Sequence, residues 1–236
     1  MANLKRQEEI LEYLSAKRFA SIAELAAALY TSQATVRRDV ELLSAQGAVK
    51  SVYGGVVLAE YEKTPVPIFF RDKENSASKE EIAEQAASMI RNNSTVIFDS
   101  SSTVRRICRH IVTRKGLTVV TNNLRVCAEL KDTDVQVICT GGTLAKGREC
   151  FVGHFAENFI RQINADQLFF SSQGVSANGD ITDSSEEEIA LRRAMIAVSK
   201  ERYFLYDDSK VGRDYPFVLC NQSDITSMLT NIVKET

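Results

Sequence analysis

The stretch Ser32-Gln-Ala-Thr-Val-Arg-Arg-Asp39 decides the fold of the first part of this chain. It is predicted to be helical because Val36, Val40 and Leu43 recur at positions i, i+4 and i+7, which form one apolar stripe on a helix. Ser32 stands before the first turn, where its hydroxyl can accept a hydrogen bond from an unpaired backbone N–H group. The polar side chains then fall away from the stripe and remain available to a partner.

A second helix is predicted one short turn earlier, over residues 21–29, because Ser21 and Glu24 have the spacing of a capping box. Two helices joined in this way predict a helix-turn-helix, whose second helix enters the major groove of DNA. Amide, hydroxyl and guanidinium groups can contact base edges and phosphates. The candidate DNA-binding residues on this helix are Ser32, Gln33, Thr35, Arg37 and Arg38. The ordinary alternative for adjacent arginines is a solvated helix face.

The neighbouring segments favour DNA binding. A helix is expected over residues 4–16, and Gly47 marks the end of the candidate recognition helix that begins after Ser32. Two short apolar runs, 48–52 and 56–58, flank Tyr53-Gly54-Gly55, which predicts a β-hairpin with a glycine turn. Three helices and a hairpin make a winged helix-turn-helix, so Tyr53, Gly54 and Gly55 are further candidate DNA contacts.

The charge of this part of the chain is balanced. Residues 1–60 contain seven Lys or Arg and seven Asp or Glu residues, so the strongly basic surface of many DNA-binding domains is missing. Binding by one copy is therefore expected to be weak and salt-sensitive. Two copies that engage paired half-sites would raise the effective concentration, so a homo-oligomer is expected.

The whole chain has the composition of a soluble globular protein with two domains. It has 236 residues, 44% of them hydrophobic and 25% charged, and a formal net charge of -2. No apolar run approaches the roughly 20 residues of a transmembrane helix. The charged N-terminus does not resemble a signal peptide. We expect a cytoplasmic protein with no membrane partner.

The cysteine and histidine content argues against several kinds of site. The five Cys residues form no C-x-x-C pair and are odd in number, so a disulfide framework is not expected. Cys108, Cys127 and Cys139 have apolar neighbours and are expected in the core. With two His residues in the chain, a His-based zinc site is not expected, and no metal, cofactor or catalytic residue is assigned.

Helices and strands are predicted to alternate from residue 78 onward, which favours a mainly parallel sheet covered on both faces. The predicted domains are 1–59, a linker over 60–77 that contains Pro65 and Pro67, and 78–236. No element is assigned to 217–233. The predicted strands are 95–98, 117–120, 135–139, 168–170 and 203–206, and the predicted helices are 78–91, one that ends near 112, 124–130, 155–163 and 186–199.

Polar residues follow several of these strands, and ligands of parallel sheets bind beyond the carboxyl ends of strands. Hydroxyls and backbone N–H groups at a helix start favour a phosphate, whereas Asp99 would repel it and suits sugar hydroxyls. Each of these hydroxyl-rich or glycine-rich segments, taken alone, is as typical of a helix cap or a turn as of a binding site. The candidate effector-binding residues are Asp99, Ser100, Ser101, Ser102, Thr103, Thr121, Asn122, Gly141, Gly142 and Lys210.

The chain resembles the DeoR-type bacterial regulators over nearly its whole length. The resemblance lies in Ser-x-x-Thr-Val-Arg-Arg-Asp-x-x-x-Leu from Ser32, the Gly-Gly wing, Lys79–Ala83, Asp99–Thr103, Val120–Asn122, Gly141-Gly142, Gly153 and Asp208–Gly212. It implies that residues 32–38 and the wing bind operator DNA, and that the second domain is similar to ribose-5-phosphate isomerase and CoA-transferase folds. It also implies that a phosphorylated sugar releases the operator. Ser101 stands where the family usually has Gly.

We therefore expect a transcriptional repressor of carbohydrate-catabolism genes. One alternative is a sugar-phosphate isomerase or CoA-transferase-like enzyme with an accessory DNA-binding domain, in which Asp99, Asp183, Glu186 and Lys210 would act in acid–base chemistry. Another is a DNA-binding protein whose second domain serves only oligomerisation. Turnover of sugar phosphates would indicate the first alternative, and absence of any small-molecule response the second.

Overall fold

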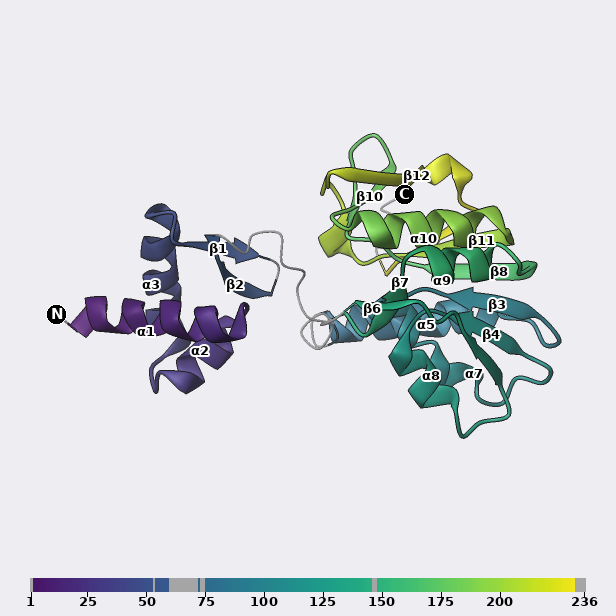
Figure 1. Ribbon diagram of the computed structural model, residues 1–236, viewed down its shortest axis with the longest axis horizontal. Helices are drawn as coiled ribbons and strands as arrows, with labels where there is room; N and C mark the ends of the chain where they lie inside the picture. The colour runs from purple at the N-terminus through teal and green to yellow at the C-terminus, as the bar shows by residue number, and fades with distance from the viewer. Residues whose placement is uncertain (1, 53, 60–71, 73–74, 146–147, 232–236) are drawn as a thin grey trace. The chain divides into compact units, whose positions relative to one another are not determined.

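The computed structural model describes residues 2–52, 54–59, 72, 75–145 and 148–231. The chain divides into two compact units, Met1–Glu74 and Asn75–Thr236 (Figure 1). Most of the segment expected to be a linker, 60–77, lies outside the described residues.

The N-terminal unit is the predicted winged helix-turn-helix. The core joins all three helices to the hairpin, and its largest fully buried side chains are Ile10, Leu14 and Leu25. Ala20 forms an antiparallel bridge with Val56, which ties the hairpin to the start of the helix-turn-helix. The elements are α1 (Ala2–Lys17), α2 (Ile22–Ala28), α3 (Gln33–Ala45), β1 (Val49–Val52) and β2 (Gly55–Leu58).

The predicted helix starts are confirmed in detail. Ser21 and Glu24 form a capping box, and the Ser32 hydroxyl accepts a hydrogen bond from the Thr35 backbone N–H. The apolar stripe of α3 is buried as expected, with Val36, Val40 and Leu43 at most 3% exposed. The local signals sufficed here because each concerns residues within two helical turns.

The C-terminal unit is built on a six-stranded sheet in which every strand pair is parallel, in the order β13-β11-β8-β3-β4-β5. This confirms the predicted parallel α/β class. Five of the strands match predicted segments, although β8 and β11 begin earlier than expected. The strands are β3 (Thr95–Phe98), β4 (Thr118–Thr121), β5 (Gln136–Cys139), β8 (Ala165–Phe170), β11 (Ser199–Leu205) and β13 (Ser227–Leu229).

Helices cover both faces of this sheet, and alternate residues of each strand enter two separate cores. Phe98 and Phe169 lie in the core against α5, α6, α7 and α8, whereas Ile97 and Phe170 lie in the core against α9 and α10. Figure 1 shows α9 and α10 on one side of the sheet and α5, α7 and α8 on the other. The helices are α5 (Ser76–Met89), α6 (Ser102–Arg105), α7 (Cys108–Ile111), α8 (Leu124–Leu130), α9 (His154–Ile160) and α10 (Glu186–Ala197).

The structure differs from the sequence prediction in three places. The single helix expected to run to residue 112 is two short helices, α6 and α7. A hairpin of β6 (Thr143–Ala145) and β7 (Cys150–Val152), and an antiparallel sheet in the order β12-β10-β9, had no predicted counterpart. The antiparallel sheet contains β9 (Gly174–Val175), β10 (Asp180–Asp183) and β12 (Phe217–Asn221). Two short 3-10 turns, η2 (Asp208–Lys210) and η3 (Gln222–Asp224), precede and follow β12 in the chain.

The cysteines also differ from expectation. Cys108 is buried, as predicted, but Cys127 is half-buried and Cys139 is exposed. Cys139 is the last residue of β5, an edge strand whose side chains are only partly covered, and this explains the difference. Among the residues described, none of the helices combines the length and apolarity needed to cross a membrane.

Candidate functional site

The exposed face of α3 carries the predicted DNA-binding side chains. Gln33, Arg37 and Arg38 are exposed, and so is the capping residue Ser32. Thr35 is half-buried, and its hydroxyl lies 2.8 Å from that of Ser32. The five predicted residues therefore lie at the N-cap or in the first two turns of α3, and none of them is buried. The N-terminal part of a recognition helix is the part that contacts base edges in the major groove.

This face borders a hollow of about 490 Å³ between α3, the start of α2 and the wing. Arg37 and Gln33 line it from the helix, and Gly54 and Gly55 line it from the hairpin turn. The Arg37 guanidinium in this concave surface can pair with a phosphate, and the Gln33 amide can contact a base edge. Glu41 also lines the hollow, so the formal charge of its lining is zero.

The two wing positions require glycine for different structural reasons. Gly54 is exposed and has a φ of +85°, a left-handed conformation that favours glycine. Gly55 has no room for a side chain, because a Cβ atom would lie 2.3 Å from the Ala20 carbonyl oxygen. Packing alone therefore accounts for Gly55, whereas Gly54 is free to approach DNA. Tyr53, the third residue predicted in the wing, lies outside the described residues.

Two acidic residues of the N-terminal unit are held in contacts within that unit. Arg6 of α1 forms an ion pair with the buried Asp39 of α3, and its Nη2 donates to Asp39 Oδ1 at 3.1 Å. Glu24 is held in the capping box of α2. Neither carboxylate is therefore available to oppose a phosphate beside Arg37.

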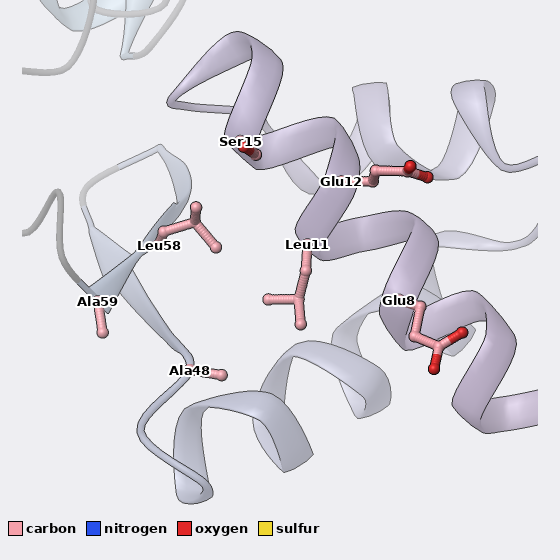
Figure 2. A pocket seen from close by; sticks show the side chains of 7 residues that line it. All are labelled: Glu8, Leu11, Glu12, Ser15, Ala48, Leu58 and Ala59. Atoms are coloured by element: carbon pink, nitrogen blue, oxygen red, sulfur yellow. The ribbon is translucent and has the colours of Figure 1, made fainter.

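A second hollow, of about 810 Å³, lies between α1 and the β1–β2 hairpin (Figure 2). Leu11, Leu58 and Ala48 give it an apolar floor, while Glu8 and Glu12 stand on α1 beside it. Two carboxylates would repel a phosphate backbone. Electrostatics therefore favours the hollow beside Arg37, and not the larger one, as the nucleic-acid interface.

Tyr30 is a residue that the sequence analysis missed. It lies in the turn between α2 and α3, is 97% exposed and has a φ of +50°. Bulky residues rarely adopt this left-handed conformation. No sequence signal marks the position, because the turn was expected to carry no special residue.

In the C-terminal unit, the loops that hold the predicted effector residues follow strands at the carboxyl end of the parallel sheet. Asp99 follows β3, Asn122 follows β4, Thr140 follows β5 and Asp207 follows β11. Adjacent strands are ~4.8 Å apart, so these positions lie in a row along the carboxyl ends of the strands. Ser171 and Ser172, which follow β8 between β3 and β11, complete it and were not predicted.

Arg192 of α10 lies at the centre of this end of the sheet, and the sequence analysis did not identify it. Its Nε donates to Asp99 Oδ2 at 2.9 Å, its Nη1 to Asp183 Oδ2 at 2.9 Å and its Nη2 to Glu188 Oε2 at 2.7 Å. Although burial alone would lower the pKa of Arg192, the three carboxylates raise it above its ordinary value. Arg192 therefore stays charged and fixes three segments that are distant in the sequence.

Arg148 adds a second cation to this cluster. It pairs with Glu188, whose other oxygen lies 3.3 Å from the Ser100 hydroxyl. Three carboxylates and two guanidinium groups leave the cluster, defined by Asp99, Asp183, Glu188, Arg192 and Arg148, with a formal charge of -1. Glu186, named in the enzyme alternative, is exposed, and Glu188 is the glutamate that lies in the site.

The Asp99–Thr103 loop is buried and internally bonded. Asp99 accepts hydrogen bonds from the backbone N–H groups of Ser101 and Ser171, and the Ser101 hydroxyl caps α6. Ser100, Ser102 and Thr103 are each at most 6% exposed. Because α6 has four residues, its dipole is weaker than that of the longer helix predicted here. Hydroxyls and N–H groups, more than a helix dipole, would have to hold an anion.

The loops after β4 and β5 contain some polar groups that are already hydrogen-bonded within the protein and others that could bind a ligand. The Thr121 hydroxyl donates to the Phe98 carbonyl at 2.8 Å, which makes it a structural link. Asn122 donates its amide to the Phe151 carbonyl, but its buried Oδ1 has no hydrogen-bond partner. Gly141 faces open space, whereas the site of a Gly142 Cβ lies 2.8 Å from the Val152 carbonyl oxygen. Of these glycines, Gly141 is the one that leaves room for a ligand.

Lys210 ends the short turn η2 beyond β11 and is half-buried. In the same segment Asp207 is 1% exposed, and its Oδ1 accepts a hydrogen bond from Asn75 at 3.2 Å. Asp207 Oδ2 is buried without a hydrogen-bond partner. Within the described part of the chain, no group of three or more His, Cys, Asp or Glu side chains is placed to hold a metal ion.

Comparison with sequence families gives two matches. The family described as "DeoR-like helix-turn-helix domain" matches residues 6–62, and the "DeoR C terminal sensor domain" matches residues 74–231. Together they cover both units, and the second alone covers more than half of the chain.

Curated relatives match along most of the chain. The HTH-type transcriptional regulator GolR of Listeria innocua is 32% identical, with 90% of this chain and 84% of the relative covered. The transcriptional repressor AccR of Agrobacterium fabrum is 30% identical over 96% of this chain and 88% of its own. The L-fucose operon activator of Haemophilus influenzae is 29% identical, with 96% and 91% covered.

Among solved structures, a D-ribose-5-phosphate isomerase in complex with phospho-erythronic acid has a TM-score of 0.44 and 10% identity, with 58% of this chain and 54% of that chain covered.

Proposed function

Because the chain belongs to the DeoR family of transcriptional regulators, we propose that it represses carbohydrate-catabolism genes and leaves its operator DNA when a phosphorylated sugar binds to the C-terminal unit. That it is a DNA-binding regulator, and not an enzyme, follows from relatives that are themselves named regulators. Repression, the sugar phosphate and the contact residues are the proposed part.

The observation that supports an effector most strongly is a pair of buried acceptors without partners. Asn122 Oδ1 and Asp207 Oδ2 lie after β4 and β11, at the sheet edge where ligands of parallel sheets bind. A buried polar atom is normally hydrogen-bonded, so an unpaired acceptor requires an explanation. Sugar hydroxyls donate hydrogen bonds. Because β4 and β11 are three strand positions apart in the sheet, about 14 Å, a sugar beside the Asp99 loop would satisfy Asn122 Oδ1. The -1 charge of the Arg192 cluster suits this neutral part of a ligand as well.

The phosphate needs different partners, because the buried carboxylates would repel it. We assign it to the Ser100–Thr103 loop, to the open backbone at Gly141 and to Lys210. Charge-assisted hydrogen bonds to a cation are roughly twice as strong as neutral ones. A sugar without the phosphate would lose these contacts and bind much more weakly.

Replacement of Lys210 by Met is expected to weaken sugar-phosphate binding about 10-fold or more, since a hydrogen bond to a charged group contributes roughly 1.5–3 kcal/mol. Calorimetry of the full chain with a panel of sugar phosphates, and with the parent sugars, measures this. Lys115→Met is the matched control, because Lys115 is exposed and precedes β4 at the opposite edge of the sheet. Equal losses in the two variants, or equal affinity for sugar and sugar phosphate, would contradict the assignment.

A homo-oligomer forms part of the proposal. The N-terminal unit presents one small DNA-binding surface, so paired copies would be needed for tight operator binding. Phe155 and Leu144 are 77% and 46% exposed, on α9 and on the β6 strand of the neighbouring hairpin. Exposed apolar side chains on adjoining elements are typical of protein–protein contacts.

The enzyme alternative has little support from the site. Asp99 and Asp183 are both ion-paired with Arg192, and Glu186 is exposed. A general acid or base must be free to exchange a proton with a substrate. The carboxylates that the alternative requires are therefore better explained as fixed parts of the protein.

A further inference from the structure

Helix α2 ends in a motif that favours glycine, and Tyr30 occupies the glycine position. The Thr31 N–H donates to the Ala26 carbonyl at 2.9 Å and the Tyr30 N–H donates to the Ala27 carbonyl at 3.3 Å, which together form a Schellman motif. This position is left-handed, and the φ of Tyr30 is +50°. Glycine is strongly enriched there, because in other residues the Cβ atom crowds the following carbonyl oxygen. Tyr30 therefore destabilises its own turn.

The Tyr30 side chain does not offset this cost within the folded chain. It is 97% exposed, so the burial of its ring contributes almost nothing to stability. Within the described part of the chain, neither its hydroxyl nor its ring has a hydrogen-bond or aromatic partner. Strained backbone conformations cluster at binding sites, so a strained and fully exposed tyrosine indicates a contact with another molecule.

Tyr30 lies beside the end of α3 that carries the candidate DNA contacts. It stands two residues before Ser32, the N-cap of α3, so the backbones of these residues are at most about 7 Å apart. A recognition helix enters the major groove with its N-terminal residues. Because that groove is only about 12 Å wide, a residue this close to the helix start lies near one of the phosphate backbones that border it. Tyrosine is among the side chains that donate hydrogen bonds to phosphates.

We propose that Tyr30 is a further operator contact, whose hydroxyl donates a hydrogen bond to a backbone phosphate beside the start of α3. The contact rests on the proposed placement of α3 in the major groove. Tyr30 does not line the hollow between α3 and the wing, so its phosphate differs from one that pairs with Arg37. A phosphate contact carries no base information, so Tyr30 adds affinity without adding sequence preference.

A contact between two copies of the chain fits Tyr30 less well. Interfaces between proteins have an apolar centre made of several side chains. Among the described residues of the N-terminal unit, the other large apolar side chain that is exposed is Leu42, at 48%. Leu42 lies nine residues after Gln33, the first residue of α3, which is about 14 Å along the helix. Tyr30 therefore stands apart from any apolar surface of that kind.

Replacement of Tyr30 by Gly is expected to have two effects of opposite sign. Glycine suits the left-handed backbone, so the α2 amides of the full-length protein should exchange with deuterium at least about threefold more slowly. Affinity for a duplex selected by the protein should fall about fivefold or more, since a hydrogen bond to a charged group is lost. A tyrosine with a purely structural role would lose protection from exchange and DNA affinity together.

Replacement of Tyr30 by Phe separates the hydroxyl from the backbone effect. This variant keeps the strain, so it should lose DNA affinity as Tyr30→Gly does but show no slower exchange. The loss should be the same for the selected duplex and an unrelated one, and the salt dependence should stay unchanged, because a neutral hydroxyl releases no counterion. Tyr215→Phe is the matched control, since it removes a hydroxyl from a half-buried tyrosine of the C-terminal unit and should bind DNA like the wild type.

Wild-type affinity in either Tyr30 variant would overturn the proposal, and so would a loss confined to the selected duplex, which would indicate a base contact. A changed sedimentation coefficient of the DNA-free variants would assign Tyr30 to an interface between copies instead. The double variant Arg37→Ala/Arg38→Ala distinguishes two kinds of failure. If it also binds like the wild type, the proposed α3 interface is wrong. If it is weakened while both Tyr30 variants are not, the Tyr30 contact alone is wrong.

Discussion

Replacement of Arg192 by Met is expected to lower the free energy of unfolding of the C-terminal unit by about 3–5 kcal/mol, the cost of leaving one side of a buried ion pair without its partner. Arg192 is 3% exposed and donates to Asp99, Asp183 and Glu188. With Arg192 gone, Arg148 alone would face three buried carboxylates. Native stability is typically 5–15 kcal/mol, so a loss of this size is a large part of the total.

Urea unfolding followed by circular dichroism measures the effect, and Arg193→Met is the matched control. Arg193 is the next residue on α10 and has the same charge, but it is exposed and donates a hydrogen bond to the Val218 carbonyl instead of to a carboxylate. The control should change stability by about 0.5 kcal/mol or less, as surface substitutions usually do. If both variants unfold at the same urea concentration as the wild type, Arg192 does not hold this edge of the sheet together.

Simultaneous replacement of Arg37 and Arg38 by Ala is expected to weaken operator binding by at least about 2 kcal/mol, or roughly 30-fold. Both side chains are exposed on α3, and Arg37 lines the hollow beside the wing. Guanidinium groups in this position contact base edges or phosphates. The variant should keep its fold, because Val36, Val40 and Leu43 supply the buried side of the helix.

Titration of a labelled duplex at several salt concentrations measures this loss. Lys115→Ala/Lys131→Ala removes the same charge from exposed positions of the C-terminal unit and should leave binding nearly unchanged. A smaller dependence on salt in the arginine variant would indicate lost phosphate contacts, and an unchanged one would indicate lost base contacts. Wild-type affinity in the arginine variant would remove α3 from the interface.

The sequence predicts the N-terminal unit well because its signals are local. Caps at Ser21 and Ser32, the stripe of Val36, Val40 and Leu43, and the Gly54 turn each concern neighbouring residues. The parallel strands were also recognisable, since apolar runs separated by helices have few other arrangements. Short strands with mixed side chains, such as β9 and β10, carry no such pattern, and β10 pairs with the distant strand β12.

The candidate effector site could be predicted only in outline. Strand ends located the Asp99 loop and Asn122, but not which atoms are already bonded. Asp99 and Arg192 are far apart in the sequence, and of the Arg192 partners only Glu188 lies one helical turn away. The Glu188–Arg192 spacing is thus the one local signal that could have indicated the cluster. The exposure of Cys139 followed from an edge position that no sequence pattern specified.

The most direct test of the proposed function is operator binding with and without effector. A duplex selected by the protein from a random-sequence pool would be titrated by fluorescence anisotropy, alone and with each member of a panel of sugar phosphates and parent sugars. Coupling between two sites typically changes affinity 5–150-fold. We predict that one sugar phosphate weakens DNA binding at least 10-fold and that its parent sugar does not. DNA affinity unchanged across the whole panel, or weakened equally by a parent sugar, would contradict it.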